Sequence, residues 1–357
     1  MPFDTHTAQR DPAAFADRLG EQINGAAVVT MISLGHRLGL FDRLAITSPC
    51  TSQSLAEACD LNERYVSEWL AVMVTGDVLD YDASSATYRL DPGHAACLTR
   101  SASPDNLAVV AQYIPLIAGM EERLLQCFRT GTGLAYPDYP CFHQVMADDS
   151  YQTVVTALFD HILPLIPGLT DRLNEGIDVL DAGCGAGKAL LALAQAFPRS
   201  RFVGYDLCLE AFEPTRARAE ELGLDNLHFE QRDLRAFDEP GRYDWIASFD
   251  AIHDQAAPDA LLAGIARALK PGGVYLMQDI AGSSYLENNL VHPLGPLLYS
   301  ISCAHCTPIS IGQGGPGLGT MWGEETARHY LHQAGFDDIQ VQRLDHDPFN
   351  VYFVARR

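Results

Sequence analysis

The sequence is short of basic residues, of long uncharged hydrophobic runs and of any hydrophobic segment near its start. Its 357 residues include 24 Lys and Arg against 46 Asp and Glu, which gives a formal net charge of −22. A chain this acidic lacks the basic face that general nucleic-acid binding requires. No uncharged apolar stretch approaches the roughly 20 residues of a transmembrane helix. We therefore expect neither nucleic acid nor a membrane as a partner.

The pattern of residues shows neither a secretion signal nor a disulfide framework. The first 15 residues, MPFDTHTAQRDPAAF, contain no hydrophobic signal core. The nine cysteines are odd in number and spread through apolar segments, which is typical of reduced thiols. These features predict a cytoplasmic location.

The cysteines and histidines do not have the spacing of a typical zinc site. Cys303, His305 and Cys306 form one C-A-H-C group, and CFH at 141–143 could add ligands. A structural zinc site usually shows two well-spaced ligand pairs. We therefore expect buried thiols in this stretch and no metal.

The N-terminal third predicts a winged helix. Residues 21–44 carry apolar side chains at helical spacing. Two shorter helices follow around a turn at Leu61 and Asn62, with Thr51 or Ser52 as a candidate N-cap of the first and Asn62 of the second. VLDY and TYRL then flank the polar turn DASSA as the strands of a hairpin, or wing.

The second of these short helices could enter a DNA groove, but its charge argues against it. Six acids and one Arg lie between Cys50 and Asp80, and such a surface would repel phosphate. We predict instead a packing module that forms a homodimer, because the apolar helix AAVVTMISLGHRLGLF needs a covering surface. The alternative is that this helix packs on its own chain.

Residues 101–175 are predicted to be mostly helical, with a loop GTGLAYPDYPCFH near the middle. Several large side chains in this segment are candidates for the wall of a substrate pocket, although many could be plain core. They are Tyr113, Met120, Phe128, Tyr136, Tyr139 and Phe142.

From residue 177 the pattern alternates strand and helix, which predicts a doubly wound α/β sheet of the Rossmann-like kind. The expected strands are IDVLDAG, RFVGYDL, LHFEQRD, YDWIASFD and GVYLMQDI. Two further strands, DDIQVQRLDH and NVYFVAR, are separated by only a few residues. Strands joined so tightly must be antiparallel.

The turn after the first of these strands reads D-A-G-C-G-A-G, from Asp181 to Gly187. Its glycines allow a sharp turn and a close approach of backbone to ligand. A dinucleotide fingerprint would need glycine where Lys188 stands, and a P-loop would need other residues at Ala182 and Ala189. Both phosphate-binding motifs therefore fail.

This turn resembles the D/E-x-G-x-G-x-G signature of class I S-adenosylmethionine-dependent methyltransferases. Asp206 ends the second strand, where an acid can hold ribose hydroxyls, and LKPGG is typical of the family. The resemblance implies S-adenosyl-L-methionine as cofactor, with Asp233 at the adenine amino group, Leu234 along the ring and the backbone of Phe249 at the methionine end. The implied cofactor-binding residues are Asp181, Gly183, Cys184, Gly185, Gly187, Asp206, Leu207, Asp233, Leu234 and Phe249.

The whole chain resembles bacterial small-molecule methyltransferases of winged-helix type, as LNERYVSEWL and the long insert after the fifth strand indicate. The implied domains are a winged helix for dimerisation, a helical connector and a cofactor-binding domain with seven strands and an antiparallel last strand. Their ranges are 1–100, 101–175 and 176–357, with an insert at 281–322. The insert is the expected substrate lid, and the acceptor-binding candidates are Tyr113, Met120, His305 and Gln313.

The stretch SFDAIHDQ follows the fourth strand, and His253-Asp254 within it resembles the H-D of plant-type winged-helix O-methyltransferases. In that group the histidine is the general base and tryptophan follows the pair, whereas Gln255 follows here. A neutral imidazole with an ordinary pKa of about 6.5 could accept a hydroxyl proton, and Asp254 or Glu287 could orient it. The alternative is a locally bonded histidine, with Asp254 or Asp259 capping the next helix.

These features predict transfer of a methyl group from S-adenosylmethionine to a small-molecule acceptor, at oxygen. Two other functions stay open at this point. One is an enzyme of the same fold that uses the cofactor for different chemistry. The other is an acidic winged-helix regulator that senses a ligand.

Overall fold

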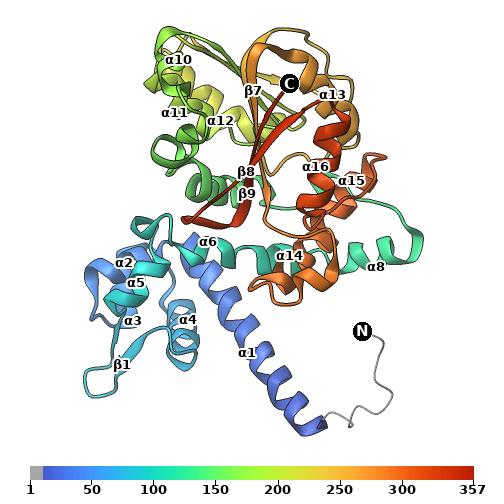
Figure 1. Cartoon of the computed structure of the whole chain (residues 1–357). Coiled ribbons are helices and arrows are strands. Elements are labelled where there is room, and N and C mark those ends of the chain that lie inside the picture. The colour runs from blue at the N-terminus through green and yellow to red at the C-terminus, as the bar shows by residue number, and fades with distance from the viewer. Residues whose placement is uncertain (1–10) are drawn as a thin grey trace. The chain divides into compact units, whose positions relative to one another are not determined.

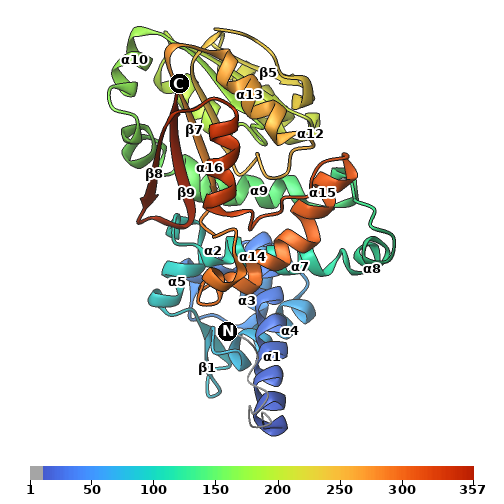
Figure 2. The ribbon, with the colours of Figure 1, turned by 45° about the vertical axis from the view of Figure 1, so that its right-hand side comes forward.

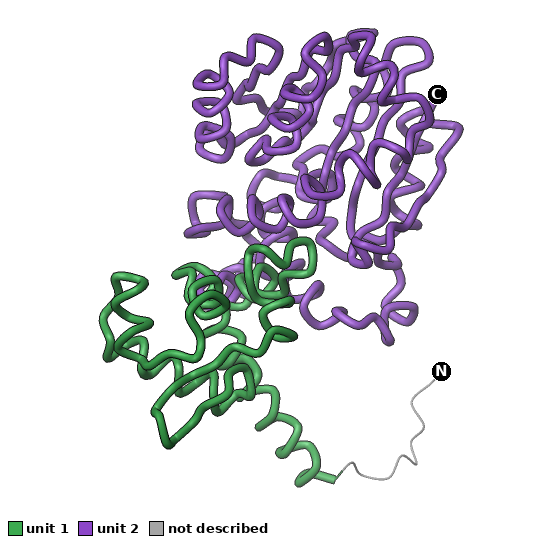
Figure 3. The backbone as a smooth tube through the Cα atoms, turned by 90° about the vertical axis from the view of Figure 1, so that its left-hand side faces the viewer, with its two compact units in different colours: residues 1–115 green, residues 116–357 purple. Residues whose placement is uncertain are grey.

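The computed structural model describes residues 11–357. The chain packs into two compact units, residues 1–115 and 116–357, coloured separately in Figure 3. The finer threefold division expected from the sequence stays a prediction. None of the helices within 11–357 combines the length and hydrophobicity that a transmembrane span requires.

The first unit is mainly helical and contains the predicted wing. Its elements are α1 (Pro12–Arg37), α2 (Leu40–Thr47), α3 (Ser52–Cys59), α4 (Glu63–Thr75), β1 (Asp80–Asp82), β2 (Thr87–Arg89), α5 (Pro92–Leu98) and α6 (Leu107–Ala111). Strands β1 and β2 pair antiparallel. Thr51 caps α3 in a capping box with Ser54, and Asn62 caps α4 through the backbone N–H of Arg64. These two predicted caps are confirmed, because each side-chain oxygen satisfies an otherwise free N–H.

The predicted single helix over residues 21–44 is wrong. Helix α1 begins earlier and ends at Arg37, and α2 begins at Leu40. Gly39 separates them with φ of 71°, a left-handed conformation that ends helices and that glycine adopts without a steric penalty.

Only one end of α1 packs within its own unit. Near that end Gly35 lies so close to the ring of Trp69 that a Cβ there would be 2.5 Å from it, and Trp69 Nε1 donates to the carbonyl of Met31 at 2.8 Å. In the described unit, Phe15, Leu19 and Ile23 of the other end remain exposed. On α4, Arg64 is already ion-paired with Glu68, which leaves the exposed face of that helix without a free cation.

The second unit is built on a seven-stranded sheet, and this confirms the predicted Rossmann-like fold class (Figure 1). Its strands are β3 (Asp178–Ala182), β4 (Arg201–Asp206), β5 (Leu227–Gln231), β6 (Tyr243–Phe249), β7 (Leu269–Ile280), β8 (Asp338–Leu344) and β9 (Asp347–Arg356). Their order is β5-β4-β3-β6-β7-β9-β8. The first five are parallel, and β9 runs antiparallel to both β7 and β8, as predicted.

Helices cover both faces of this sheet (Figures 1 and 2). The helices of this unit, those on the sheet and those beyond it, are α8 (Glu121–Thr130), α9 (Phe142–Ser150), α10 (Leu169–Glu175), α11 (Lys188–Ala196), α12 (Leu209–Glu221), α13 (Pro258–Ala268), α14 (Gly295–Ile301), α15 (Thr307–Gly312) and α16 (Gly323–Gln333). α7 (Tyr113–Ala118) crosses the boundary between the units. Apolar residues of α10 and α11 pack on one face, and those of α13 and α16 pack on the other.

The predicted insert at 281–322 is helical and packs tightly against the helical connector. A Cβ on Gly133 would lie 1.9 Å from the backbone nitrogen of Gly312, and Leu134 N donates to the carbonyl of Pro308 at 2.9 Å. A Cβ on Gly312 would likewise lie 2.0 Å from the carbonyl oxygen of Leu134, so both glycines are required where the two chain segments cross.

Candidate active site

The glycine-rich turn after β3 has the geometry that its sequence predicts. Gly183, Gly185 and Gly187 have φ of 82°, 50° and 65°, a region that side chains disfavour. A Cβ on Gly187 would lie 2.3 Å from the ring of Phe229, whereas one on Gly185 would meet no atom within 4 Å. Gly187 therefore fixes the turn against its neighbours, and Gly185 faces open space.

Asp206, at the end of β4, holds this turn in place. Its Oδ2 accepts from Gly185 N and its Oδ1 from Cys208 N, both at 2.8 Å. Burial raises the pKa of Asp206 in spite of these two hydrogen bonds. Each carboxylate oxygen retains a second lone pair for a ligand hydroxyl.

Asp181 is a buried carboxyl group at the root of the same turn. Its Oδ1 accepts no hydrogen bond from the described residues. Burial and, to a lesser extent, the charge of Asp206 raise the pKa of Asp181 to about 8. A cationic ligand group nearby would favour the ionised form.

The other predicted cofactor residues differ from one another in burial and in their contacts. Asp233 follows β5, accepts from Arg235 N at 3.0 Å and forms an ion pair with Arg235. Leu234 is packed in the core, Leu207 is partly exposed, and Phe249 ends β6 at the edge of the core. Cys184 lies within the glycine turn, where burial raises its thiol pKa.

His253 is held by a carboxylate that the sequence did not single out. The chain leaves β6 through Asp250, which has a φ of 47°, and His253 is then buried. Its Nδ1 lies 2.8 Å from Asp279 Oδ1, near the end of β7. Trp322 Nε1 and the backbone N of Ile280 donate to the same oxygen at 2.9 and 2.8 Å.

This arrangement fixes the orientation of the imidazole ring. Since Nδ1 is engaged by a carboxylate, Nε2 is the nitrogen left to face other groups. Asp254 Oδ1 lies 3.5 Å from Nε2. The expectation that Asp254 or Glu287 orients the ring is corrected, because Asp279 makes the short contact. Asp279 could have been found as the one acid in the mainly apolar strand segment GVYLMQDI.

The expected ordinary pKa of His253 is wrong for this environment. Burial opposes protonation of the ring, but the charges of Asp279 and Asp254 outweigh it and hold the pKa of His253 well above its usual value. The two carboxylates therefore favour the protonated ring.

The alternative role for the acids of SFDAIHDQ as helix caps is also wrong. Ala257 is the N-cap residue of α13 and makes no side-chain cap. Asp254 lies beside His253, and Asp259 lies in the first turn of α13.

Aromatic side chains gather beside this histidine, from the connector and the insert. His305 stacks on Phe142 with ring centroids 3.9 Å apart and meets Tyr139 edge-on at 4.8 Å. Its Nδ1 lies 3.7 Å from Asp254 Oδ2. Burial lowers the pKa of His305 to about 4, so it is neutral where His253 is charged.

Comparisons with known proteins match both units. The Rv2258c-like winged HTH domain family matches residues 26–100, and a methyltransferase domain family matches residues 173–335. A trans-aconitate 2-methyltransferase of Deinococcus radiodurans is 34% identical over 119 residues, which cover 32% of this chain and 42% of that protein. A fatty-acid O-methyltransferase of Mycolicibacterium smegmatis is 31% identical over 105 residues, covering 29% and 38%. The chain thus spans less than half the length of these two relatives.

Solved structures with the same fold cover nearly the whole chain. A Nostoc punctiforme protein described as an O-methyltransferase has a TM-score of 0.70 at 21% identity, with 98% of this chain and 99% of that chain covered. Human N-acetylserotonin methyltransferase, solved with S-adenosylmethionine, has a TM-score of 0.66 at 20% identity, with 98% and 99% covered. Residues 26–100 thus match a winged HTH domain and residues 173–335 a methyltransferase domain, in a chain that has the fold of these solved structures.

Several acceptor-binding candidates of this methyltransferase lie together. Met120, Tyr139 and Phe142 share a small apolar cluster with Ile309, against which Tyr136 packs. Phe128 was expected in the pocket wall, but 77% of it is exposed on α8, so that expectation is wrong.

Two further acceptor-binding candidates are not brought into that cluster. Gln313 ends α15 and donates to the carbonyl of Ile309 at 3.2 Å. Tyr113 is buried and belongs to the first unit.

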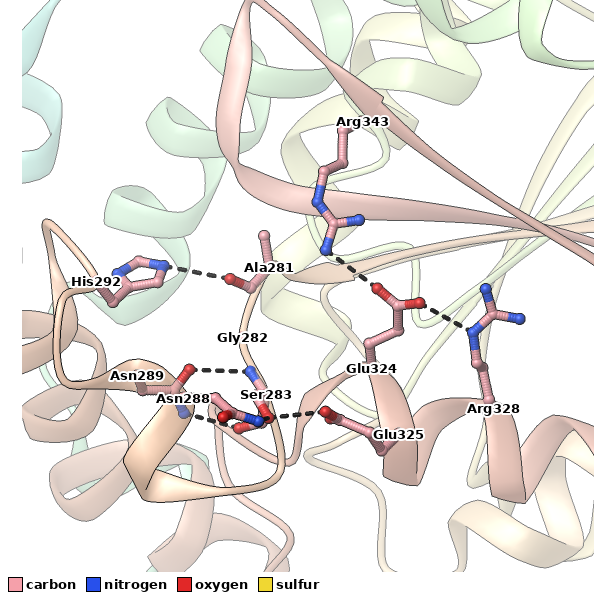
Figure 4. Close-up of a pocket in the computed structure, with 10 residues that line it drawn as sticks. All are labelled: Ala281, Gly282, Ser283, Asn288, Asn289, His292, Glu324, Glu325, Arg328 and Arg343. Carbon is pink, nitrogen blue, oxygen red and sulfur yellow. Dashed lines mark hydrogen bonds and ion pairs between the residues drawn. The ribbon is translucent and has the colours of Figure 1, made fainter.

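A separate polar cavity of about 490 Å³ lies between the start of the insert, α16 and β8 (Figure 4). Its charges neutralise one another, because Glu324 pairs with both Arg328 and Arg343. Glu325 accepts from Ser283 Oγ at 2.8 Å. None of the predicted site residues lines this cavity, so it is distinct from the methyltransferase site.

The contact between His253 and Asp279 gives a prediction for the free protein. Asp279→Asn removes a negative charge 2.8 Å from Nδ1 and should lower the pKa of His253. The measurement is a pH titration of the ring proton by NMR, with His253→Gln to assign the resonance and Asp259→Asn as a control for a nearby charge. An unchanged pKa of His253 in Asp279→Asn would show that Asp279 does not stabilise the protonated form of this ring.

Proposed function

We propose that this protein transfers the methyl group of S-adenosyl-L-methionine to a hydroxyl oxygen of a small-molecule acceptor, with His253 as the general base. The observation that carries the proposal is that the histidine segment adjoins the glycine turn. A Cβ on Gly183 would lie 2.7 Å from the Cβ of Ala251, two residues before His253. A base and a cofactor-binding turn in contact can align an acceptor with the transferred group.

The residues around the turn fit the cofactor. Gly185 leaves space for a ligand, and Asp206 has free lone pairs for ribose hydroxyls. The unpartnered, buried Asp181 suits the cationic charge of the methionine portion. When bound, the cofactor supplies a methyl group already activated on a sulfonium. The cofactor roles of Asp233, Leu234, Leu207, Cys184 and Phe249 are part of this proposal.

His253 acts in this proposal only after it has lost its resting proton. Nδ1 stays bonded to Asp279, and Nε2, on the other side of the ring, accepts the acceptor's hydroxyl proton as the oxygen attacks. Because the pKa of His253 is raised, the base form is scarce at neutral pH but strongly basic when present. Asp254, beside Nε2, stabilises the imidazolium that forms.

The aromatic groups next to His253 are suited to an acceptor with a flat apolar body. Phe142, Tyr139 and His305 offer ring faces and edges. We include Met120, Gln313 and Tyr113 as acceptor-binding residues on the sequence argument. The decisive experiment is a screen of small hydroxylated compounds with methyl-labelled cofactor, read out as labelled product together with S-adenosylhomocysteine. Cofactor turnover without labelled product would favour the alternative of non-methyl-transfer chemistry.

We also propose that the first unit forms a homodimer through α1. Phe15, Leu19 and Ile23 recur every four residues and therefore lie on one face of that helix. They are 58%, 43% and 62% exposed in the single chain. A second copy of the same face would remove this apolar surface from water.

Cofactor binding should depend on Asp206. Asp206→Ala removes hydrogen bonds to a charged group, each worth about 1.5–3 kcal/mol, so affinity for S-adenosylhomocysteine should fall by about 10–100-fold. Isothermal titration calorimetry measures this, and Asp225→Ala, at an exposed acid on the chain before β5, is the matched control. Equal affinity of Asp206→Ala and wild type would remove Asp206 from the site.

Turnover should depend on His253 and rise with pH. His253→Ala should lower kcat by about 10²–10⁴-fold, with little change in cofactor affinity. In the wild type, kcat/KM should increase as the pH rises through the raised pKa of His253. The pH–rate profile of Asp279→Asn should shift to lower pH. A near-normal kcat of His253→Ala, measured with an identified acceptor, would refute the role of His253 as general base.

The dimer should depend on the exposed face of α1. Ile23→Asp together with Leu19→Asp places two charges on this face and should convert a dimer into a monomer, as measured by light scattering at micromolar concentration. Asp17→Asn on the same helix is the control. A monomeric mass for the wild type would contradict the proposal.

A further inference from the structure

We propose that His253, Asp254 and Cys306 form a binding site for a divalent transition-metal ion of the zinc class. The three residues are each buried, and one ligand atom from each lies within 4.8 Å of the others. Nitrogen, oxygen and sulfur from such side chains are the usual ligands of zinc. The zinc ligands weighed from the sequence were those of the C-A-H-C stretch and of CFH at 141–143, whereas the fold brings Cys306 close to His253 and Asp254, which follow β6.

The separation of the ligand atoms is close to what an ion requires. Ligands at about 2.0–2.3 Å from zinc lie no more than about 4 Å apart in a tetrahedron. Nε2 of His253 and Oδ1 of Asp254 are 3.5 Å apart, within that limit. Only a small inward movement of Cys306 is then needed, and the fourth position is left for water or another ligand.

Neighbouring side chains hydrogen-bond to two of the three proposed ligands and hold them in position. Asp279 holds Nδ1 of His253 at 2.8 Å, as carboxylates do for many zinc-bound histidines. Thr320 Oγ1 donates to Cys306 Sγ at 2.9 Å. These partners orient two of the ligands before any ion arrives.

A buried carboxylate oxygen that accepts no hydrogen bond lies at this position, within 3.5 Å of His253 Nε2, where an ion could bind both atoms. Asp254 is 7% exposed, and its Oδ1 accepts no hydrogen bond from the described residues. A buried carboxylate oxygen without a hydrogen bond is costly. A divalent ion would offset the charges of Asp254 and of a Cys306 thiolate, with His253 neutral and still bonded to Asp279.

Metal binding would compete with catalysis. Nε2 has one lone pair, so His253 cannot accept a proton there while it holds an ion. This consequence rests on the proposed function, whereas metal binding itself does not. Zinc should therefore inhibit methyl transfer, and a chelator should restore it.

The test measures binding by the full-length protein directly. Cobalt(II), a spectroscopic substitute for zinc, should bind in one equivalent and give the thiolate-to-metal absorption band of a cysteine-bound ion. Cys306→Ser should abolish the band. Cys303→Ser, which removes an exposed thiol three residues away, should leave it unchanged. Near-ultraviolet circular dichroism checks that Cys306→Ser is folded.

A second variant keeps the thiol of Cys306 and tests Oδ1 of Asp254, which accepts no hydrogen bond from the described residues. Asp254→Asn should weaken zinc binding by at least about 10-fold in competition with a chromophoric chelator, since it loses an anionic ligand. Absence of the band in the wild type, its persistence in Cys306→Ser, or equal zinc affinity in Asp254→Asn would each overturn the site. If activity is never detected, these binding measurements still decide the metal site.

Discussion

The hydrogen bond between His253 and Asp279 is the contact on which the rest of the site depends. It is buried and involves a charged group, and such bonds are strong where water is excluded. It joins the segment after β6 to the end of β7, and Trp322 attaches the end of the insert to the same carboxylate oxygen. Three segments that are distant in sequence thus meet at a single atom, and removing that atom would release all of them.

The carboxyl edge of the sheet gathers buried carboxyl groups whose pKa the fold raises. Burial and the charge of Asp279 raise the pKa of Asp250 well above its ordinary value, although His253 lowers it. Burial likewise raises the pKa of Asp181, on the neighbouring strand. The opposite edge is different, because Lys270 bridges Asp178 and Asp244 there, both at 2.7 Å. A cation bound at the carboxyl edge would lower these raised pKa values and favour the ionised acids, so cation binding and ionisation are linked there.

Much of this could be predicted from the sequence, because the responsible signals are local. The periodicity of apolar residues predicts the order of strands and helices. The glycines at 183, 185 and 187 predict the turn after β3, since each adopts a backbone conformation that other residues disfavour. The division between α1 and α2 was missed because the apolar period continues across Gly39. Asp279 was missed because its importance arises only when β6 and β7 pair. The position of Cys306 could not be read from spacing, since about 50 residues separate it from His253.

The attachment of the insert at both ends links its interior to the histidine. The chain leaves the sheet at Ala281, whose N–H donates to Phe349 O at 2.8 Å, and returns at Trp322, fixed to Asp279. Between these anchors, His305 and Cys306 lie beside Asp254 and His253. A change of sequence inside the insert would therefore alter the environment of His253 together with the aromatic side chains around His305, so the two cannot vary independently.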